Sequence, residues 1–353
     1  MADRNMTFAE IEVIAPNLKR RLSGVTATVV RLMPLLQNRI GIVTTGPGLP
    51  DDLPHIALAR CFWMPRDRWR VWHARRNTEM ALGLILRHVF RRKLRMLFTS
   101  AAQRHHKPFT RWLIRRMEAV VATSPQAKSY LEVAATVVMH GVDCEIFRPA
   151  DDRTALRRAL GLPEKGLILG CFGRIRAQKG VDLLVEAALA LLPDRPDVHV
   201  IFTGRVTDDN RAFHADLVAR LTAAGISDRV RFLGELPWSE IVRHYQVLDL
   251  FVAPARWEGF GLTPLEAMAC GVPAIGARVG AFEALIKDGT TGSLVPPGDA
   301  KALTDAILGW IDDRPRLASA GPLARAHVAT NHRIEAEADS LVAIYRKLLD
   351  AKT

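Results

Sequence analysis

The sequence of 353 residues has few cysteines and no long apolar run. Its N-terminus, MADRNMTFAE, lacks the apolar core of a secretion signal, and no segment reaches the roughly 18 apolar residues that span a bilayer. The cysteines also lack the paired spacings of metal centres and redox motifs. We therefore expect a cytoplasmic protein that keeps them reduced, as small core residues: Cys61, Cys144, Cys171 and Cys270.

Charge of one sign is concentrated in the first half of the chain. Residues 1–150 hold 24 Lys and Arg against 11 Asp and Glu, a net charge of +13, whereas residues 151–353 carry a net charge of −1. An anionic partner for the first half is therefore expected. Nucleic acid, anionic lipid and a phosphorylated substrate all fit the charge alone.

Short tandem repeats and low-complexity tracts are absent, and the length suits two domains. Both halves alternate β-rich runs with helical patterns, which predicts parallel sheets with crossover helices. We expect an α/β protein of two doubly wound units that bind ligands beyond the carboxyl ends of the strands. The predicted strands are 11–16, 41–45, 71–74, 96–100, 119–124 and 136–141, then, after a linker at 143–166, 167–174, 198–205, 230–236, 248–255, 272–278 and 292–298.

The segment EGFGLTPLE contains two glutamates, Glu258 and Glu266, with seven residues between them. It follows a predicted strand, and its glycines let the backbone approach a ligand before a helix that we expect to begin near Leu262. Amides at such a helix start form a seat for a phosphate, and glutamates beside it would bind sugar hydroxyls. That combination describes a nucleotide sugar. An ordinary loop with acids near a helix N-terminus fits these residues equally well.

The segment GRIRAQKG at 173–180 places Arg174 directly after another predicted strand and Lys179 at the next helix start. Two cations at one sheet edge would neutralise a diphosphate, and arginine can bind it through two hydrogen bonds. Taken alone, the segment is explained by two solvated bases on a surface turn. Taken with the glutamate pair, it favours a site for a nucleoside diphosphate.

Together with GVPAIGARVGAFEALIKDGTTGSLVPPGD, these segments resemble the donor domain of family 4 retaining glycosyltransferases, which have the GT-B fold. The resemblance covers essentially the whole chain and implies two Rossmann-like domains that face a central cleft. It implies an acceptor-binding domain at 1–148, completed by a C-terminal helix at 333–353 that crosses back to it. The nucleotide-sugar donor-binding domain would then be 149–332.

The resemblance also implies roles for individual residues. Arg174 and Lys179 would bind the leaving diphosphate, Glu258 the transferred sugar and Glu266 the ribose. The first three, together with His105, are the catalytic candidates. The base of the nucleotide would lie against the turn that ends the strand at 230–236, near Glu235 and Leu236. The expected donor-binding residues are Gly24, Gly173, Arg174, Lys179, Glu235, Leu236, Glu258, Gly259, Phe260, Gly261, Leu262 and Glu266.

The first half is similar to one branch of this family, the lipopolysaccharide-core mannosyltransferases of alphaproteobacteria. The similar segments are APNLKRRLSGVTATVVRL, VWHARRNTEM and FTSAAQRHHKPFTRWLIRRM. The resemblance implies mannose transfer from GDP-mannose to a Kdo residue of a lipid A precursor. A UDP-sugar-dependent transferase of the same fold is the alternative. Gly24 matches the glycine of the family's first strand–helix loop, which approaches the donor phosphate, although a plain turn glycine is the other interpretation.

An Asp-x-Asp motif is also absent, so we expect neither a metal nor a cofactor. The charge that develops on the leaving GDP would be met by the two cations and the helix N-terminus. Without an obvious carboxylate nucleophile, retention suggests attack on the face that the leaving group departs from. Glu283, in GAFEALIKDG, matches a family glutamate that we expect to be structural.

A histidine that many family members carry directly after one strand is missing here. Thr99 and Ser100 occupy the end of that strand, and two histidines follow several residues later. We favour His105 as the residue that contacts the sugar, with His73 and His106 as the other candidates. For each of the three, a packed histidine or one paired with a phosphate fits as well.

Residues 60–128 contain 17 Lys and Arg against 3 Asp and Glu. A helix predicted at 79–90 has a basic face and an apolar stripe, which we expect to be buried and which consists of Leu82, Ile85, Leu86 and Val89. Basic residues near an anionic membrane add about 1 kcal/mol each to binding, and they would equally grip Kdo carboxylates or lipid A phosphates. The expected acceptor or membrane residues are Arg75, Arg76, Arg91, Arg92, Arg104, His106 and Lys107.

Three other classes of protein remain as rivals. A nucleic-acid-binding protein would explain the charge, but no recognisable binding module is present and the second half would have no role. An epimerase of the same fold needs no basic surface, and a catalytically dead carbohydrate-binding module would not need all four donor-site residues. We therefore predict an enzyme at the inner face of the cytoplasmic membrane, peripherally bound and without a nucleic-acid partner.

Overall fold

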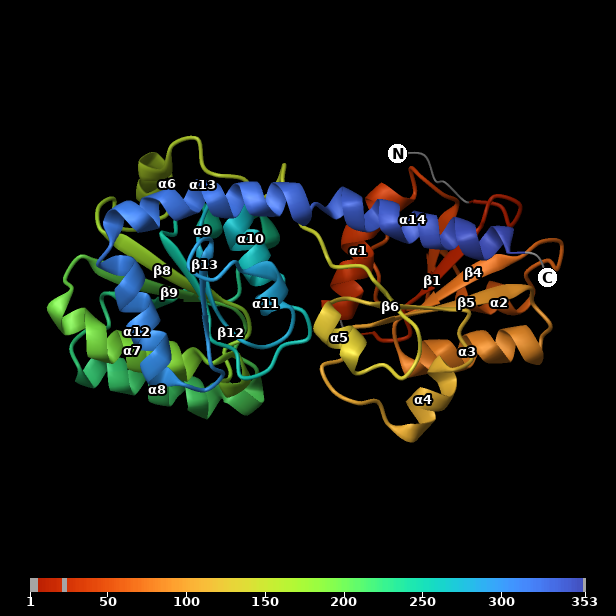
Figure 1. The fold of residues 1–353 in the computed structure, drawn as a ribbon, viewed down its shortest axis with the longest axis horizontal. Helices are drawn as coiled ribbons and strands as arrows, with labels where there is room; N and C mark the ends of the chain where they lie inside the picture. Colours follow the sequence, from red (N-terminus) through yellow and green to blue (C-terminus); the bar gives the residue numbers. More distant parts are fainter. Residues whose placement is uncertain (1–5, 21–23, 352–353) are drawn as a thin grey trace. The chain divides into compact units, whose positions relative to one another are not determined.

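The computed structural model describes residues 6–20 and 24–351. The chain divides into two compact units, which are described separately below (Figure 1). Unit 1 comprises Met1–Met139 and Ile334–Thr353, and unit 2 comprises His140–Arg333. The sequence predicts this boundary at residue 148. The assignment of acceptor and donor binding to the two units stays a prediction.

Unit 1 is built on a parallel sheet, for which the described residues give the strand order β3-β2-β1-β4-β5-β6-β7. Its strands are β1 (Val13–Pro16), β2 (Ile42–Thr45), β3 (His55–Ile56), β4 (Arg70–Ala74), β5 (Leu94–Ser100), β6 (Ala119–Ala122) and β7 (Thr136–Val137). Its helices are α1 (Gly24–Leu36), α2 (Leu58–Phe62), α3 (Asn77–His88), α4 (Pro108–Ile114), α5 (Pro125–Ser129) and α14 (Ile334–Asp350).

Successive residues of these strands pack on opposite faces of the sheet, as the pleat requires. Val13 and Val71 belong to a core with α1 and α14, whereas their neighbours Ile14 and Trp72 belong to a second core with α3 and α4. Both faces are therefore covered by helices. This explains why the strands read as continuous apolar runs rather than alternating ones.

Unit 2 repeats this arrangement with a parallel sheet in the order β10-β9-β8-β11-β12-β13. Its strands are β8 (Leu167–Phe172), β9 (Val198–Thr203), β10 (Val230–Phe232), β11 (Leu250–Ala253), β12 (Ala274–Ala277) and β13 (Gly292–Val295). Its helices are α6 (Arg153–Ala159), α7 (Val181–Leu191), α8 (Arg211–Ala223), α9 (Trp238–Gln246), α10 (Thr263–Ala269), α11 (Phe282–Leu285), α12 (Ala300–Ile311) and α13 (Arg314–Asn331). Three single 3-10 turns are η1 (Ala177–Lys179), η2 (Leu192–Asp194) and η3 (Asp208–Asn210).

In each sheet the strand order reverses beside the first strand, so β1 lies next to β4 and β8 lies next to β11. The connections that leave these paired strands turn toward opposite faces of the sheet, which opens a crevice at their carboxyl ends. The doubly wound prediction is confirmed for both sheets. The two reversal points are where ligand-binding residues are expected.

The predicted linker at 143–166 is wrong as a description of the structure, because its central part is a helix packed in unit 2. Asp152 caps α6 by accepting from the backbone N–H of Ala155 at 2.9 Å. Arg157, on this helix, is buried and donates to Asp249 at 2.6 Å and to the Val247 carbonyl at 2.7 Å. The sequence shows these charged residues but not their partners, so their composition suggested a linker.

Among the described residues, no helix is both long and apolar enough to cross a membrane. The same part of the chain contains no group of three or more His, Cys, Asp and Glu side chains suited to hold a metal ion. The four cysteines are buried, and none of them forms a disulfide bond.

Candidate active site

The reversal point of unit 2 is flanked by two loops that carry the segments singled out in the sequence. Residues 173–180 lead from β8 to α7, and residues 254–262 lead from β11 to α10. Because β8 and β11 are parallel neighbours, both loops leave the same edge of the sheet. The fold thus places GRIRAQKG beside EGFGLTPLE, which are more than 70 positions apart in the chain.

Hydrogen bonds join the two loops directly. The backbone N–H of Arg256 donates to the carbonyl of Gln178 at 2.9 Å, and the Gln178 side chain donates to the carbonyl of Trp257 at 3.2 Å. The Arg256 guanidinium also donates to both carboxylate oxygens of Asp182, in the first turn of α7, at 2.8 and 2.7 Å. These bonds hold the cationic segment and the glutamate segment in one arrangement.

Each loop contains a glycine at a point of close packing. Gly180 has φ +69°, and a Cβ there would lie 1.9 Å from the carbonyl oxygen of Pro254. Gly261 has φ +91°, and its Cβ would lie 2.1 Å from the ring of Phe282. Both positions therefore require glycine. For Gly261 the structure shows contact with a side chain of the same unit, whereas the sequence predicts close approach to a ligand.

Lys179 and Glu258 form an ion pair across the two loops. Their side chains are 22% and 17% exposed, and the other carboxylate oxygen of Glu258 accepts from the N–H of Gly259 at 3.0 Å. Both line a small pocket at the ends of β8 and β11. Its other lining residues are Cys171, Phe172, Gly173, Val181, Ala253, Ala255, Thr263 and Phe282.

Arg174 and Arg176 add two guanidinium groups to the same loop. Arg174 is exposed and Arg176 is half-buried. Burial, and then the charge of Arg174, lower the pKa of Arg176, while Glu258 acts in the opposite direction. The Nε of Arg176 is buried without a hydrogen-bond partner in the described part of the chain. Sequence reasoning missed Arg176, although its place two residues after Arg174 was the available signal.

Glu266 lies on α10 and is held by a buried tyrosine. The hydroxyl of Tyr245, on α9, donates to Glu266 Oε2 at 2.7 Å. The tyrosine ring is 1% exposed and packs against Phe172, Phe251 and Phe147. Burial and the neighbouring carboxylate raise the pKa of Tyr245 well above its ordinary value, so the hydroxyl remains a donor. Nothing in the sequence pairs Tyr245 with Glu266, because the two residues come from different helices.

The remaining donor-site candidates of unit 2 lie around these loops. Phe260 is buried, and its ring contacts that of His140 with 4.7 Å between centroids. Leu262 is the residue before α10. Glu235 is exposed and Leu236 half-buried, in the turn after β10. The carbonyl of Gly234 anchors that turn to the end of β9 by accepting from the Gly204 N–H and the Thr203 hydroxyl, each at 2.8 Å.

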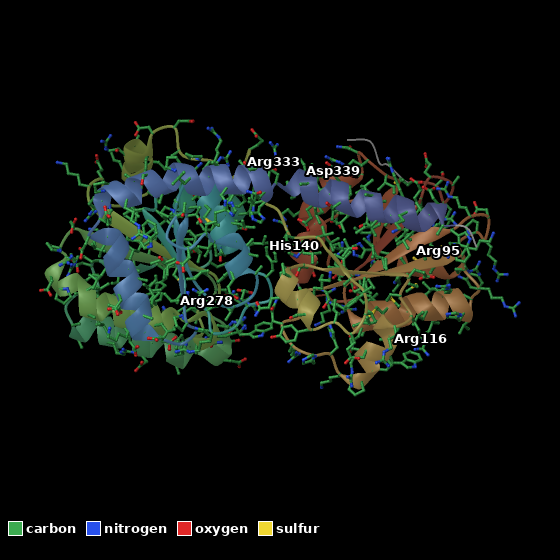
Figure 2. The ribbon with its side chains drawn as sticks, viewed as in Figure 1. Arg95, Arg116, His140, Arg278, Arg333 and Asp339 are labelled. Carbon is green, nitrogen blue, oxygen red and sulfur yellow. The ribbon has the colours of Figure 1, made fainter. Side chains whose placement is uncertain are left out.

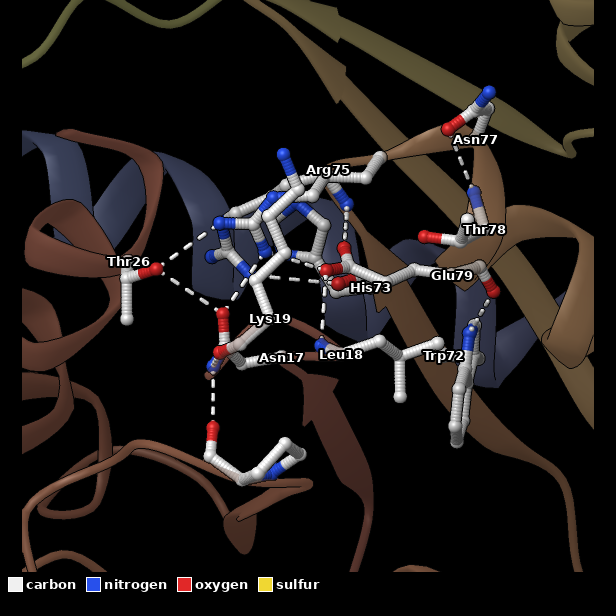
Figure 3. A network of polar contacts seen from close by, with 12 residues as sticks. Asn17, Leu18, Lys19, Thr26, Trp72, His73, Arg75, Asn77, Thr78 and Glu79 are labelled. Carbon is white, nitrogen blue, oxygen red and sulfur yellow. Dashed lines mark hydrogen bonds and ion pairs between the residues drawn. The ribbon is translucent and has the colours of Figure 1, made fainter. Parts of the chain in front are cut away.

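Figure 3 shows a polar network at the reversal point of unit 1, where β1 and β4 end. The Arg76 guanidinium donates to Glu79 at 2.6 Å, to the side-chain oxygen of Asn17 at 2.9 Å and to the hydroxyl of Thr26 at 3.0 Å. Glu79 is fully buried and also accepts from the backbone N–H of Arg75 at 2.8 Å. The network therefore joins the segment after β1, helix α1 and the first turn of α3.

Of the three candidate histidines, His73 is an interior residue. One ring nitrogen shares a hydrogen bond of 2.7 Å with the hydroxyl of Tyr345 on α14, and the other shares one of 2.7 Å with Thr99. Burial, followed by the charge of Arg75, lowers the pKa of His73 well below its ordinary value, so the ring is neutral. Both of its ring nitrogens are occupied within unit 1, and it ties α14 to the sheet.

The other two histidines lie before α4. His105 is exposed, and its ring meets the edge of Tyr130 with 5.3 Å between centroids. His106 is half-buried, and its Nε2 lies 3.1 Å from the hydroxyl of Ser100 at the end of β5. Burial and the charges of Arg104 and His105 lower the pKa of His106.

The basic residues expected to meet an acceptor or a membrane fall into two groups. Arg76 has a side chain only 11% exposed, and Arg92 donates to the carbonyl of Met64 at 2.7 Å, so both bind within unit 1. Arg75 is half-buried like Arg92. The exposed members are Arg91, Arg104 and Lys107.

Two residues remain from the sequence predictions. Gly24 is the first residue of α1 and is exposed, and a Cβ there would meet no atom within 4 Å. The three residues before it lie outside the described part of the chain. Glu283, on α11, is exposed and forms an ion pair with Arg278 at 3.1 Å. Neither geometry by itself assigns a role in ligand binding.

Known proteins of similar sequence identify the family. The family described as "Glycosyl transferases group 1" matches residues 152–327. The lipopolysaccharide core biosynthesis mannosyltransferase LpsB of Rhizobium meliloti (strain 1021) is 48% identical, over 96% of this chain and 98% of its own. The mannosyltransferase of the same description, LpcC of Rhizobium leguminosarum bv. viciae, is 50% identical, over 96% of this chain and 97% of its own.

Solved structures show the same architecture. HepE of Anabaena, in complex with UDP and glucose, has a TM-score of 0.82 over 96% of this chain and 100% of its own, at 18% identity. Sucrose-phosphate synthase of Thermosynechococcus elongatus has a TM-score of 0.80 over 97% of this chain and 100% of its own, at 21% identity. At these identities the likeness concerns the fold alone. The chain belongs to the group 1 glycosyl transferases, which are enzymes, and it has the GT-B fold.

Proposed function

We propose that this glycosyltransferase moves mannose from GDP-mannose to a Kdo residue of a lipid A precursor in lipopolysaccharide core synthesis. The observation that carries the proposal is the extent of the likeness to LpsB and LpcC, which covers 96% of the chain and so includes unit 1. Relatives named D-inositol 3-phosphate glycosyltransferase match only 56% to 67% of the chain. Likeness through both units favours a shared acceptor as well as a shared donor.

The donor would bind at the two joined loops of unit 2. Arg174, Arg176 and Lys179 supply positive charge beside a pocket, and a diphosphate leaving group needs that charge when the bond to the sugar breaks. Glu258 would then exchange its bond with Lys179 for hydroxyls of the sugar. In this scheme the cations of the chain take the part that a divalent metal has in other transferases.

The reaction would retain the configuration at the anomeric carbon. The acceptor hydroxyl would attack from the face that the GDP leaves, and a phosphate oxygen of the leaving group would take its proton. The bond from the anomeric carbon to phosphate oxygen breaks as the bond to the acceptor oxygen forms. A glycosyl-enzyme trapped on any side chain would contradict this scheme.

The acceptor would be a lipid at an anionic membrane surface, which places the enzyme peripherally at the cytoplasmic face. The basic excess of unit 1 is suited to the phosphates and Kdo carboxylates of such a lipid. His105 and the exposed cations Arg104 and Lys107 precede or begin α4 and are our candidates for this contact.

The nucleotide is tested by calorimetric titration of the purified protein with GDP, UDP, GDP-mannose and UDP-glucose in the presence of EDTA. We expect binding of the two guanine nucleotides at least about tenfold tighter than that of the uridine pair, because discrimination through buried polar contacts reaches this size or more. Tighter binding of the uridine nucleotides would replace the donor by a UDP-sugar. Loss of GDP binding in EDTA would contradict metal independence.

Tyr245→Phe tests whether Glu266 binds the ribose. Without the hydroxyl, the Glu266 carboxylate loses a donor that fixes its position, and a hydrogen bond to a charged group is worth about 1.5–3 kcal/mol. We expect GDP affinity to fall about tenfold, while affinity for 2′,3′-dideoxy-GDP stays within about twofold of the unmodified enzyme. Calorimetry with both nucleotides measures the difference.

The matched control is Tyr345→Phe, which removes the hydroxyl of another fully buried tyrosine whose partner is His73 in unit 1. It should leave the affinity for both nucleotides unchanged. Equal losses of GDP and dideoxy-GDP affinity in Tyr245→Phe would show that the tyrosine supports unit 2 generally and does not position Glu266 for the ribose.

A further inference from the structure

Unit 1 exposes an unusual set of large apolar side chains. Trp63 is 76% exposed, Val89 70%, Phe109 59%, Trp112 48% and Ile85 45%. We call these five residues the apolar surface. They come from the end of α2, from α3 with the residue after it, and from α4. The sequence predicts that the stripe on α3 is buried, and this is wrong for Ile85 and Val89.

Contacts beneath the apolar surface join the segments that carry Trp63, Ile85 and Val89. The rings of Phe62 and Phe90, the neighbours of Trp63 and Val89, meet edge to face with 4.9 Å between centroids. The bond from Arg92 to the carbonyl of Met64 ties the same two segments. Ile85 lies one helical turn before Val89 and accepts a hydrogen bond from its N–H at 2.9 Å.

Phe109 and Trp112 lie on α4, and their rings are stacked with an interplanar angle of 14° and 6.1 Å between centroids. Helices α3 and α4 pack against each other. Leu84 and Leu86 of α3 belong to the same buried core as Leu113 and Ile114 of α4. This core is complete without the apolar surface, so its five members are available to something outside the chain.

Positive charge surrounds these side chains. The acids within residues 60–128 are already bonded to arginines, in the pairs Asp67–Arg70, Glu79–Arg76 and Glu118–Arg87. The guanidinium of Arg116 lies over the Trp112 ring at 3.6 Å, and Figure 2 shows Arg116 beside α4. Other exposed basic side chains adjoin the five residues in sequence: Arg66, His88, Arg91, Lys107 and Arg115.

This combination matches an anionic lipid surface more closely than other occupants. Tryptophan and phenylalanine partition into the headgroup region of a bilayer, and arginine beside them meets lipid phosphates. A second copy of the chain would bring two basic surfaces together, which repel each other. Contiguous exposed apolar groups on a monomer mark an interaction site.

We propose that the apolar surface inserts into the headgroup region of an anionic membrane, with the basic side chains around it bound to lipid phosphates. The inference rests on the proposed function only in that a lipid acceptor requires the enzyme to work at a membrane. The membrane contact is assigned to α2, α3 and α4. Arg76 and Arg92 bind within unit 1 and do not contribute to the membrane contact.

The test is sedimentation of the full chain with phosphatidylcholine vesicles that contain or lack phosphatidylglycerol, in low and high salt. Two double variants remove the apolar contacts, Trp63→Ser with Val89→Ser and Phe109→Ser with Trp112→Ser. Each should weaken binding to the anionic vesicles at least about tenfold, because burial of such side chains stabilises by this amount or more. Arg91→Glu with Arg116→Glu should weaken it about tenfold or more in low salt and less in high salt.

The matched control is Val218→Ser with Leu323→Ser, which removes two exposed apolar side chains of unit 2 and should leave vesicle binding unchanged. Unchanged binding in the unit 1 variants overturns the proposal, as does a concentration-dependent dimer that those variants abolish. The proposed reaction is tested separately by transfer to a short soluble Kdo acceptor, which the serine variants should keep. Failure of the wild type in that assay alone would count against the proposed function and not against the membrane surface.

Discussion

Lys179→Ala should lower kcat for mannosyl transfer about 10²- to 10³-fold, the range observed when one preorganised donor to a developing anion is removed. The lysine ends η1, and Gly180 and α7 follow it with backbone bonds that do not involve its side chain. We therefore expect the melting temperature to change little. Steady-state transfer from GDP-mannose to a soluble acceptor, with thermal denaturation of the same samples, measures both quantities.

The ion pair between Lys179 and Glu258 must break before the two side chains can contact the donor. In the structure each group neutralises the other within the pocket, so donor binding must exchange this bond for contacts with the nucleotide sugar. Glu258→Gln weakens the pair without removing the lysine. It should therefore lower GDP affinity less than Lys179→Ala does, while it lowers turnover through its loss of contact with the sugar.

Lys301→Ala is the control for charge. Lys301 is 85% exposed on α12 and pairs with Asp305, so its removal changes the net charge of unit 2 by the same amount far from the two loops in sequence. Turnover should stay within about twofold of the wild type, because surface ion pairs contribute little. If turnover of Lys179→Ala also stays within about twofold of the wild type, the lysine does not stabilise the leaving group.

The sequence was sufficient for those parts of the fold and site that depend on the parallel sheets. Strands buried on both faces read as apolar runs, and parallel neighbours end at one edge, so GRIRAQKG and EGFGLTPLE could be placed together. The ion pair of Lys179 with Glu258 was not predicted, because the resemblance assigns the lysine to a diphosphate and the glutamate to a sugar. The bonds of Arg256 with Gln178 and Asp182 were not predicted either.

Other features depend on contacts between residues with no local relation in the chain. Tyr245 reaches Glu266 from another helix, and His73 finds Tyr345 272 positions away. Composition made 143–166 look like a linker, whereas the distant Asp249 fixes Arg157 within unit 2. The exposure of Val89 could not be predicted. Helical periodicity shows that a stripe of a helix is apolar, but it does not show whether other residues cover that stripe.

Glu79→Ala should produce the largest loss of stability among the polar residues of unit 1, about 3–5 kcal/mol in the free energy of unfolding. The carboxylate is fully buried with Arg76 at 2.6 Å, and its removal leaves that buried guanidinium without a countercharge and the N–H of Arg75 without its acceptor. Urea denaturation measures the loss. Amide hydrogen exchange should locate it in β1, β4 and the start of α1, which the network in Figure 3 connects.

Two further variants distinguish the loss of a buried charge from the loss of any carboxylate that binds arginine. Glu79→Gln keeps an oxygen for the N–H of Arg75 but loses the ion pair, so its loss should be smaller than that of alanine. Glu132→Ala removes a carboxylate of the same unit that also binds arginines, Arg111 and Arg115, but is 38% exposed, and it should cost less than about 1 kcal/mol. If Glu79→Ala costs no more than Glu132→Ala, the Arg76 network does not hold the segment after β1, and Asn17 and Thr26 must be fixed by their remaining contacts alone.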